Sequence, residues 1–184
     1  PWWEGLGEGD IDLEEKGWSV MGIVSFAIAL ISYLIASLEY FVYLAYRKPV
    51  VQTLATGTVF LGLVFHTLVL AFRSSETGHG PYTTSFEVAL FLAWMIVVIY
   101  FLIELKYKIK DLGSFVIPLV FLIVRYSAFL SKEIGLQIPQ SDARFWLTMH
   151  RTLSIIGYAA FSMAFGAAIM YLIQERQVKS KKLG

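Results

Sequence analysis

A histidine and an arginine stand side by side in the apolar segment Phe145–Tyr158 and are the side chains best placed for chemistry. His150 and Arg151 lie about a turn and a half inside the expected helix. A charge at a membrane edge costs free energy, so such a pair indicates a function. Small or amphipathic residues follow on the His150 face at helical spacing: Ser154, Gly157 and Tyr158. This face is therefore expected to receive a flat ligand, such as haem, or another helix.

Two further histidines extend the candidate site. His79 stands in the turn-rich segment Ser74–Thr84, and His66 lies inside an apolar run. Imidazole is a standard axial ligand of haem iron, and two imidazoles make a six-coordinate b-type site. His150 is therefore the first candidate ligand, with His79 or, as a weaker choice, His66 as the second. In the alternative interpretation, these histidines only order loops and pack helices.

Arginines are expected at the same level of the membrane as His79 and His150. They are Arg73, Arg144 and Arg151. Haem carries two propionates, and the planar guanidinium group matches a carboxylate. Arg151 and Arg144 are therefore the candidate propionate partners.

Composition excludes several other chemistries. The chain has no cysteine, so it forms no disulfide, no thiolate metal site and no covalent c-type haem link of its own. The spacing of the histidines fits no metal motif such as HExxH, and no nucleophile elbow or phosphate loop is present. The short basic C-terminal segment lacks interleaved aromatic residues, so no nucleic-acid partner is expected.

The 184 residues are 57% hydrophobic, with a mean hydropathy of +0.65. A soluble domain is usually about half apolar, and here the excess forms runs of about 20 residues. The sequence therefore predicts an all-α, polytopic transmembrane helix bundle in contact with membrane lipid. The five predicted spans are Trp18–Tyr46, Val50–Phe72, Tyr82–Leu105, Leu112–Leu130 and Phe145–Ile173.

Basic residues predict the orientation of the spans. Nine of them flank one side and belong inside by the positive-inside rule: Arg47, Lys48, Lys106, Lys108, Lys110, Arg176, Lys179, Lys181 and Lys182. The N-terminus, the His79 loop and the start of the last span then share the outer side. We expect an acidic extracytoplasmic segment at 1–17, a five-helix domain at 18–178 and a basic cytoplasmic tail at 179–184.

Two stretches resemble the cytochrome c assembly family, the System II CcsA/ResC type of haem-handling membrane proteins. GHGPYTTSFE, residues 78–87, is similar to that family's GHxPxSNxYES segment. FWLTMHRTLSIIGYAAF, residues 145–161, resembles its WLxxHVxxxxxGYAA helix. The order of the two motifs, their separation and the surrounding spans agree as well, so the resemblance covers residues 18–178. The HemX-type regulator of tetrapyrrole synthesis shares this architecture.

The resemblance implies a role for each matching residue. The family histidine that matches His150 is an outer-surface axial ligand of haem, which is presented there to CxxCH motifs of apocytochromes c. His79, Pro81 and Glu87 match the family loop. Thr83 and Thr84 stand where the family usually has Ser-Asn. The tryptophan-rich segment that follows this helix in the family, and the later spans with the second axial histidine, are not among the 184 residues. The resemblance is therefore to the N-terminal five-span portion, in a longer protein or in a short relative.

The leading hypothesis is haem delivery or ligation in cytochrome c maturation, with haem b as cofactor. Its partners would be a second membrane subunit and apocytochrome c or another c-type cytochrome. The expected location is a bacterial-type inner membrane or a thylakoid-type membrane. Whether the chain is an enzyme is left open, although the family includes components of cytochrome c haem lyases. One rival is a non-catalytic anchor or accessory subunit of a respiratory complex. Another is a helical packing partner that uses glycines: Gly57, Gly62, Gly157 and Gly166.

Overall fold

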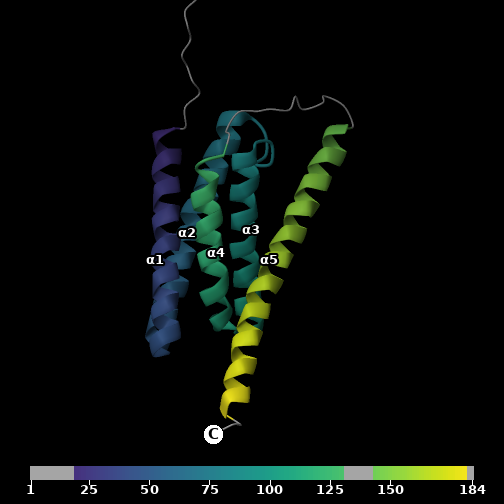
Figure 1. The fold of residues 1–184 in the computed structure, drawn as a ribbon. Helices are drawn as coiled ribbons and strands as arrows, with labels where there is room; N and C mark the ends of the chain where they lie inside the picture. Colours follow the sequence, from purple (N-terminus) through teal and green to yellow (C-terminus); the bar gives the residue numbers. More distant parts are fainter. Residues whose placement is uncertain (1–18, 131–142, 182–184) are drawn as a thin grey trace, which may run out of the picture.

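The computed structural model describes residues 19–130 and 143–181, which form a bundle of α-helices (Figure 1). The helices are α1 (Val20–Tyr46), α2 (Pro49–Thr77), α3 (Ser85–Tyr107), the short 3₁₀ helix η1 (Lys110–Leu112), α4 (Gly113–Ser127) and α5 (Ala143–Lys181). The described residues contain no strand. The all-α polytopic class is confirmed. The predicted segment 1–17 lies outside the described residues.

Four of these helices are long and apolar enough to cross a membrane: α1, α2, α3 and α5. α4 is shorter than the predicted span Leu112–Leu130, because it ends at Ser127. Its 15 residues rise about 22 Å, against a hydrocarbon core of about 30 Å. α5 is longer than the predicted Phe145–Ile173, and its 39 residues rise about 58 Å. The fifth helix therefore continues well beyond the apolar stretch that identified it.

Local signals in the sequence explain where the helices begin and end. Pro49 occupies the first turn of α2, where its missing N–H costs nothing. Gly78 ends α2 in the left-handed conformation, with φ 70°, which glycine adopts without strain. α3 begins with a capping box formed by Thr84 and Glu87. This capping box fixes the start of α3 directly after the His79 loop.

The helices run alternately up and down, so that the α2–α3 loop and the start of α5 lie at one end of the bundle (Figure 1). The α1–α2 turn, η1 and the end of α5 lie at the other end. This arrangement agrees with the grouping of loops that the charge pattern predicted, although which end faces the cytoplasm stays a prediction. α1 and α2 pack most extensively, whereas α5 lies obliquely against α3 and α4.

A polar cavity of about 410 Å³ lies at the end of the bundle that holds the α1–α2 turn. Asp111 lines it and accepts a hydrogen bond from the Tyr43 hydroxyl at 2.6 Å and from Gln52 Nε2 at 3.4 Å. Arg47 Nη1 also donates to Asp111, at 3.3 Å. Through Asp111, these contacts join η1, which directly precedes α4, to the start of α2 and the end of α1. They stabilise the end of the bundle remote from the histidine motifs.

Two of the four glycines singled out in the sequence mediate helix packing. A Cβ at Gly62 would lie 2.8 Å from Tyr33 Cε1, and one at Gly166 would lie 2.8 Å from Val116 Cγ2. A Cβ at Gly57 or Gly157 would meet nothing within 4 Å. Close packing through glycine therefore joins α1 to α2 and α4 to α5.

We expect Gly166→Leu to destabilise the protein by about 1–3 kcal/mol, because the added side chain would push α5 away from Val116 on α4. The matched control is Gly57→Leu, which enters open space and should leave stability close to the wild-type value. Thermal unfolding in detergent measures both variants. Equal midpoints for Gly166→Leu and Gly57→Leu would contradict this packing contact between α4 and α5.

Candidate functional site

The loop between α2 and α3 is folded around the carboxylate of Glu87, which is fully buried. Arg73 Nε on α2 donates to Glu87 Oε1 at 3.0 Å. The backbone N–H groups of Thr83 and Thr84 both donate to Glu87 Oε2 at 3.1 Å. A buried carboxylate is stable only when donors or cations surround it, and these three donors meet that need. Glu87 therefore joins the end of α2, the loop and the start of α3.

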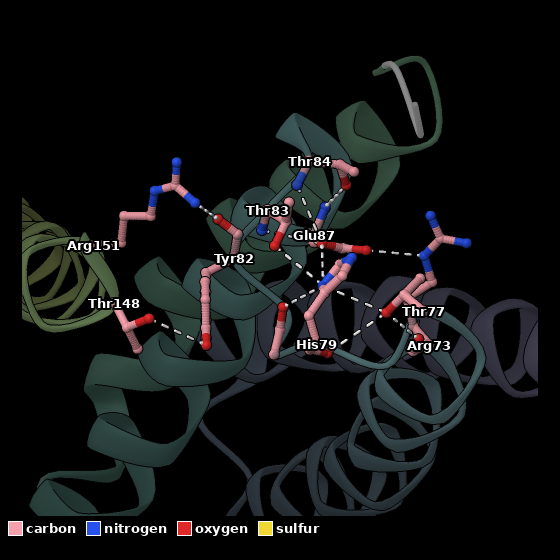
Figure 2. A network of polar contacts seen from close by, with 10 residues as sticks. Arg73, Thr77, His79, Tyr82, Thr83, Thr84, Glu87, Thr148 and Arg151 are labelled. Atoms are coloured by element: carbon pink, nitrogen blue, oxygen red, sulfur yellow. Dashed lines mark hydrogen bonds and ion pairs between the residues drawn. The ribbon is translucent and has the colours of Figure 1, made fainter. Parts of the chain in front are cut away.

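His79 is turned into this loop network (Figure 2). Its Nδ1 lies 3.0 Å from the carbonyl oxygen of Gly80, 3.1 Å from Thr83 Oγ1 and 3.9 Å from Glu87 Oε2. A carbonyl only accepts hydrogen bonds, so Nδ1 carries a hydrogen, and in the neutral ring the lone pair is then on Nε2. Nε2 is buried and has no hydrogen-bond partner in the part of the chain that the structure describes. This is the ring arrangement that commonly orients a metal-binding histidine.

Tyr82 joins the loop to α5. Arg151 Nη1 donates to the backbone carbonyl of Tyr82 at 3.4 Å, and Thr148 Oγ1 donates to the Tyr82 hydroxyl at 3.4 Å (Figure 2). The two α5 residues are three positions apart and thus lie on one side of the helix. The two sequence motifs, separated by more than 60 residues, meet at this tyrosine.

α5 packs against the bundle through one face and leaves the opposite face open. Ile155, Ala159 and Met163 are buried. His150 is exposed, and the rotation of about 100° per residue places it on the opposite side of the helix from Ala159. Within residues 19–130 and 143–181, its imidazole makes no hydrogen bond. The Ser154 hydroxyl donates to the His150 backbone carbonyl at 2.7 Å, and no other described side chain binds either ring nitrogen of His150.

The structure separates the residues that the sequence had grouped. Arg151, and not its neighbour His150, meets the glycine-proline loop, because consecutive helix residues point about 100° apart. His79 faces Glu87, and no hydrogen bond among the described residues links it to His150. Arg144 lies in the first turn of α5, but its side chain is outside what the structure describes.

His66 is buried inside α2 and belongs to neither motif. Its Nδ1 is 3.2 Å from the Tyr33 hydroxyl on α1, and the two rings meet edge to face with centroids 5.8 Å apart. This contact accounts for a histidine in an apolar helix without a ligand.

Sequence reasoning missed the Arg73–Glu87 ion pair and the Tyr82 contacts with α5. The ion pair had a signal, because Thr84 and Glu87 match the capping-box pattern, which places the Glu87 carboxylate at the helix start. No local sequence pattern indicated the Tyr82 contacts, since its partners Thr148 and Arg151 are distant in the chain.

The described residues contain no group of three or more His, Cys, Asp or Glu side chains that could hold a metal ion. A free imidazole on an exposed face can instead serve as one axial ligand to a metal that a macrocycle already holds. His150 fits that role directly. His79 fits through Nε2, provided that its buried surroundings admit the ligand.

Comparison with known proteins shows which family this chain resembles. The family model described as cytochrome c assembly protein matches residues 82–184. The cytochrome c biogenesis protein CcsA of Chlorella vulgaris is 34% identical over 110 residues, covering 58% of this chain and 35% of that protein. The CcsA protein of Prochlorococcus marinus strain MIT 9215 is 27% identical over 173 residues, covering 90% of this chain and 54% of that protein.

A CcsA protein of Synechocystis is 26% identical over 153 residues, covering 80% of this chain and 45% of the relative. The chain thus spans about half the length, or less, of these relatives. No solved structure matches the chain.

Proposed function

The chain belongs to the cytochrome c assembly protein family, CcsA type, and on that premise we propose that it handles haem in cytochrome c maturation. The cofactor we propose is haem b, with His150 as an axial ligand. It would be held at the end of the bundle where the α2–α3 loop meets the start of α5. Because the chain spans about half of its relatives, the activity of a whole family member is part of this proposal.

The observation that carries the proposal is the free imidazole of His150. It projects from the face of α5 that no described helix covers, and neither ring nitrogen has a partner in the part of the chain that the structure describes. A Cβ at Gly157, two turns along the same face, would meet nothing within 4 Å. An exposed histidine above open, small-residue surface suits the approach of a flat macrocycle.

The neighbouring residues have supporting roles. Arg151 uses one of its five N–H donors on the Tyr82 carbonyl, so others are left for a propionate. Arg144, in the first turn of the same helix, is a second propionate partner. His79 is the candidate second ligand through Nε2.

Bound haem would supply the iron and the macrocycle that are attached to the CxxCH motif of an apocytochrome c. This chain has no cysteine, so the thiols for that attachment must come from the apocytochrome. The role proposed for this chain is to bind the macrocycle, to orient it and to form ion pairs with its propionates. A second membrane subunit would cover the open face of α5.

The chain is a multi-pass membrane protein. We propose the bacterial inner membrane or the thylakoid membrane as its location, since its relatives include cyanobacterial and plastid CcsA proteins. By the positive-inside rule, His150 would then face the extracytoplasmic side. The alternative of a non-catalytic respiratory subunit is not favoured by these relatives.

The proposal is tested by purifying the protein from membranes in mild detergent and measuring haem as its pyridine haemochrome. We expect haem b to accompany the protein close to one per chain, with a b-type band in the reduced-minus-oxidised spectrum. Protein purified from haem-sufficient cells without a b-type band would overturn haem handling by this chain.

A further inference from the structure

We propose that Tyr82 is a positioning residue, which fixes the rotation of α5 about its axis and thereby the direction in which His150 points. The part that concerns bound haem rests on the proposed function. The part that concerns the rotation of α5 stands without it.

Tyr82 is itself held firmly. The next two residues, Thr83 and Thr84, give their backbone N–H groups to the buried carboxylate of Glu87. On the other side, the Tyr82 N–H donates to the Gly80 carbonyl at 2.8 Å. The Glu87 carboxylate is fixed in turn by Arg73 on α2. Tyr82 therefore connects α5 to the most buried polar network at this end of the bundle.

Two separate hydrogen bonds to Tyr82 restrain the rotation of α5 about its axis. The Tyr82 carbonyl accepts from Arg151, and its hydroxyl accepts from Thr148, one turn earlier on α5. These two atoms lie at opposite ends of the tyrosine, and Figure 2 shows the side chain reaching from the loop to the helix. A single contact would still let α5 turn about that point, whereas two contacts along one side of the helix restrain its rotation.

The start of α5 has little else to hold it. From Phe145 to Ser154 no described side chain is buried, and the buried face begins at Ile155. His150 therefore lies in a part of the helix whose hydrogen bonds to the rest of the bundle, among described residues, all go to Tyr82. Removing the Tyr82 side chain takes away the Thr148 contact and leaves only the Arg151 contact with the backbone carbonyl, so this part should rotate more freely while the helix beyond Ile155 stays packed.

Because the chain has no cysteine, introduced cysteines can carry spin labels without background. We would label Ser85→Cys on α3 and Trp146→Cys on α5, both exposed positions, and measure the distance between the labels by double electron–electron resonance. The variant is Tyr82→Ala. Its matched control is Tyr171→Ala, which removes an exposed tyrosine from the far end of α5.

We expect Tyr82→Ala to broaden the distance distribution at least about twofold and Tyr171→Ala to leave it unchanged. Tyr82→Phe keeps the ring and the carbonyl but lacks the hydroxyl that accepts from Thr148, so we expect a smaller broadening than in Tyr82→Ala, similar to that in Thr148→Val. Thr148→Val leaves the loop intact, so it tests the contact even if Tyr82→Ala fails to fold, and we expect a smaller broadening. An unchanged distribution in both Tyr82→Ala and Thr148→Val would overturn the positioning role.

Where the wild-type protein carries haem, electron paramagnetic resonance of the oxidised form gives a second readout. We expect the low-spin g values to shift or spread in Tyr82→Ala and to change less in Tyr82→Phe, because they depend on the orientation of the axial imidazole. Unchanged g values beside a broadened distance distribution would overturn only the effect on His150. A wild-type protein without haem would overturn the proposed function, while the distance measurement still decides the role of Tyr82.

Discussion

Replacing His150 with alanine is expected to lower the haem content of the purified protein by tenfold or more, without lowering its thermal stability. Loss of residues that merely orient a metal ligand costs roughly 10–100-fold in affinity, and loss of the ligand itself should cost at least as much. The stability should not change because the imidazole is exposed and makes no hydrogen bond among the described residues. The haemochrome assay measures the first effect, and thermal unfolding of the haem-free wild type and variant measures the second, since bound haem would itself stabilise the protein.

His66→Ala is the matched control, and the opposite pattern is expected. Its imidazole is buried against the Tyr33 hydroxyl, so its removal leaves a cavity and a buried hydroxyl without this partner. Stability should fall while the haem content per folded protein stays at the wild-type value. Haem loss in His66→Ala with full retention in His150→Ala would place the iron on α2 and contradict the assignment of His150.

Replacing Glu87 with alanine is expected to be the most destabilising single change at this end of the bundle, at about 3–5 kcal/mol. Removing the Glu87 carboxylate takes away its buried ion pair with Arg73, and two backbone N–H groups lose their acceptor as well. The loop should open. A cysteine at the buried position Thr83 then reports the opening through its labelling rate.

Two further variants show how much of this loss of stability comes from the charge of Glu87 and how much from its buried position. Glu87→Gln keeps an acceptor for the loop N–H groups but not the charge, so its loss of stability should lie between those of the wild type and Glu87→Ala. Glu175→Ala removes a carboxylate from the exposed pair with Lys179 and should cost less than about 1 kcal/mol. If Glu87→Ala were no more costly than Glu175→Ala, Glu87 would not organise the loop.

The helices and their order were predictable because each is an apolar run long enough to span a bilayer, and such runs need no distant partner to be recognised. Helix ends were less predictable. α5 continues to Lys181 through residues of high helix propensity such as Gln174 and Glu175, which a hydropathy criterion excludes. α4 ends at Ser127 because the next residues form a turn instead of continuing the apolar helix.

The candidate site was predictable only in part. The sequence correctly placed His150, Ser154 and Gly157 along one face of a helix, and the structure shows that face uncovered by the described helices. It could not show which neighbour of His150 meets the loop. That depends on how α5 is rotated against α3, which packing at Ile155 and contact with Tyr82 decide.

The central claim is that the His150 imidazole ligates haem iron, and rescue by free imidazole tests it most directly. His150 is exposed, so a small molecule can enter the space that its side chain leaves in His150→Ala. With haem added to the purified variant, millimolar imidazole should restore the wild-type low-spin b-type spectrum, and 2-methylimidazole, whose methyl group crowds the ligating nitrogen, should not. A His150→Ala protein whose spectrum already equals that of the wild type, before any imidazole is added, would contradict the assignment.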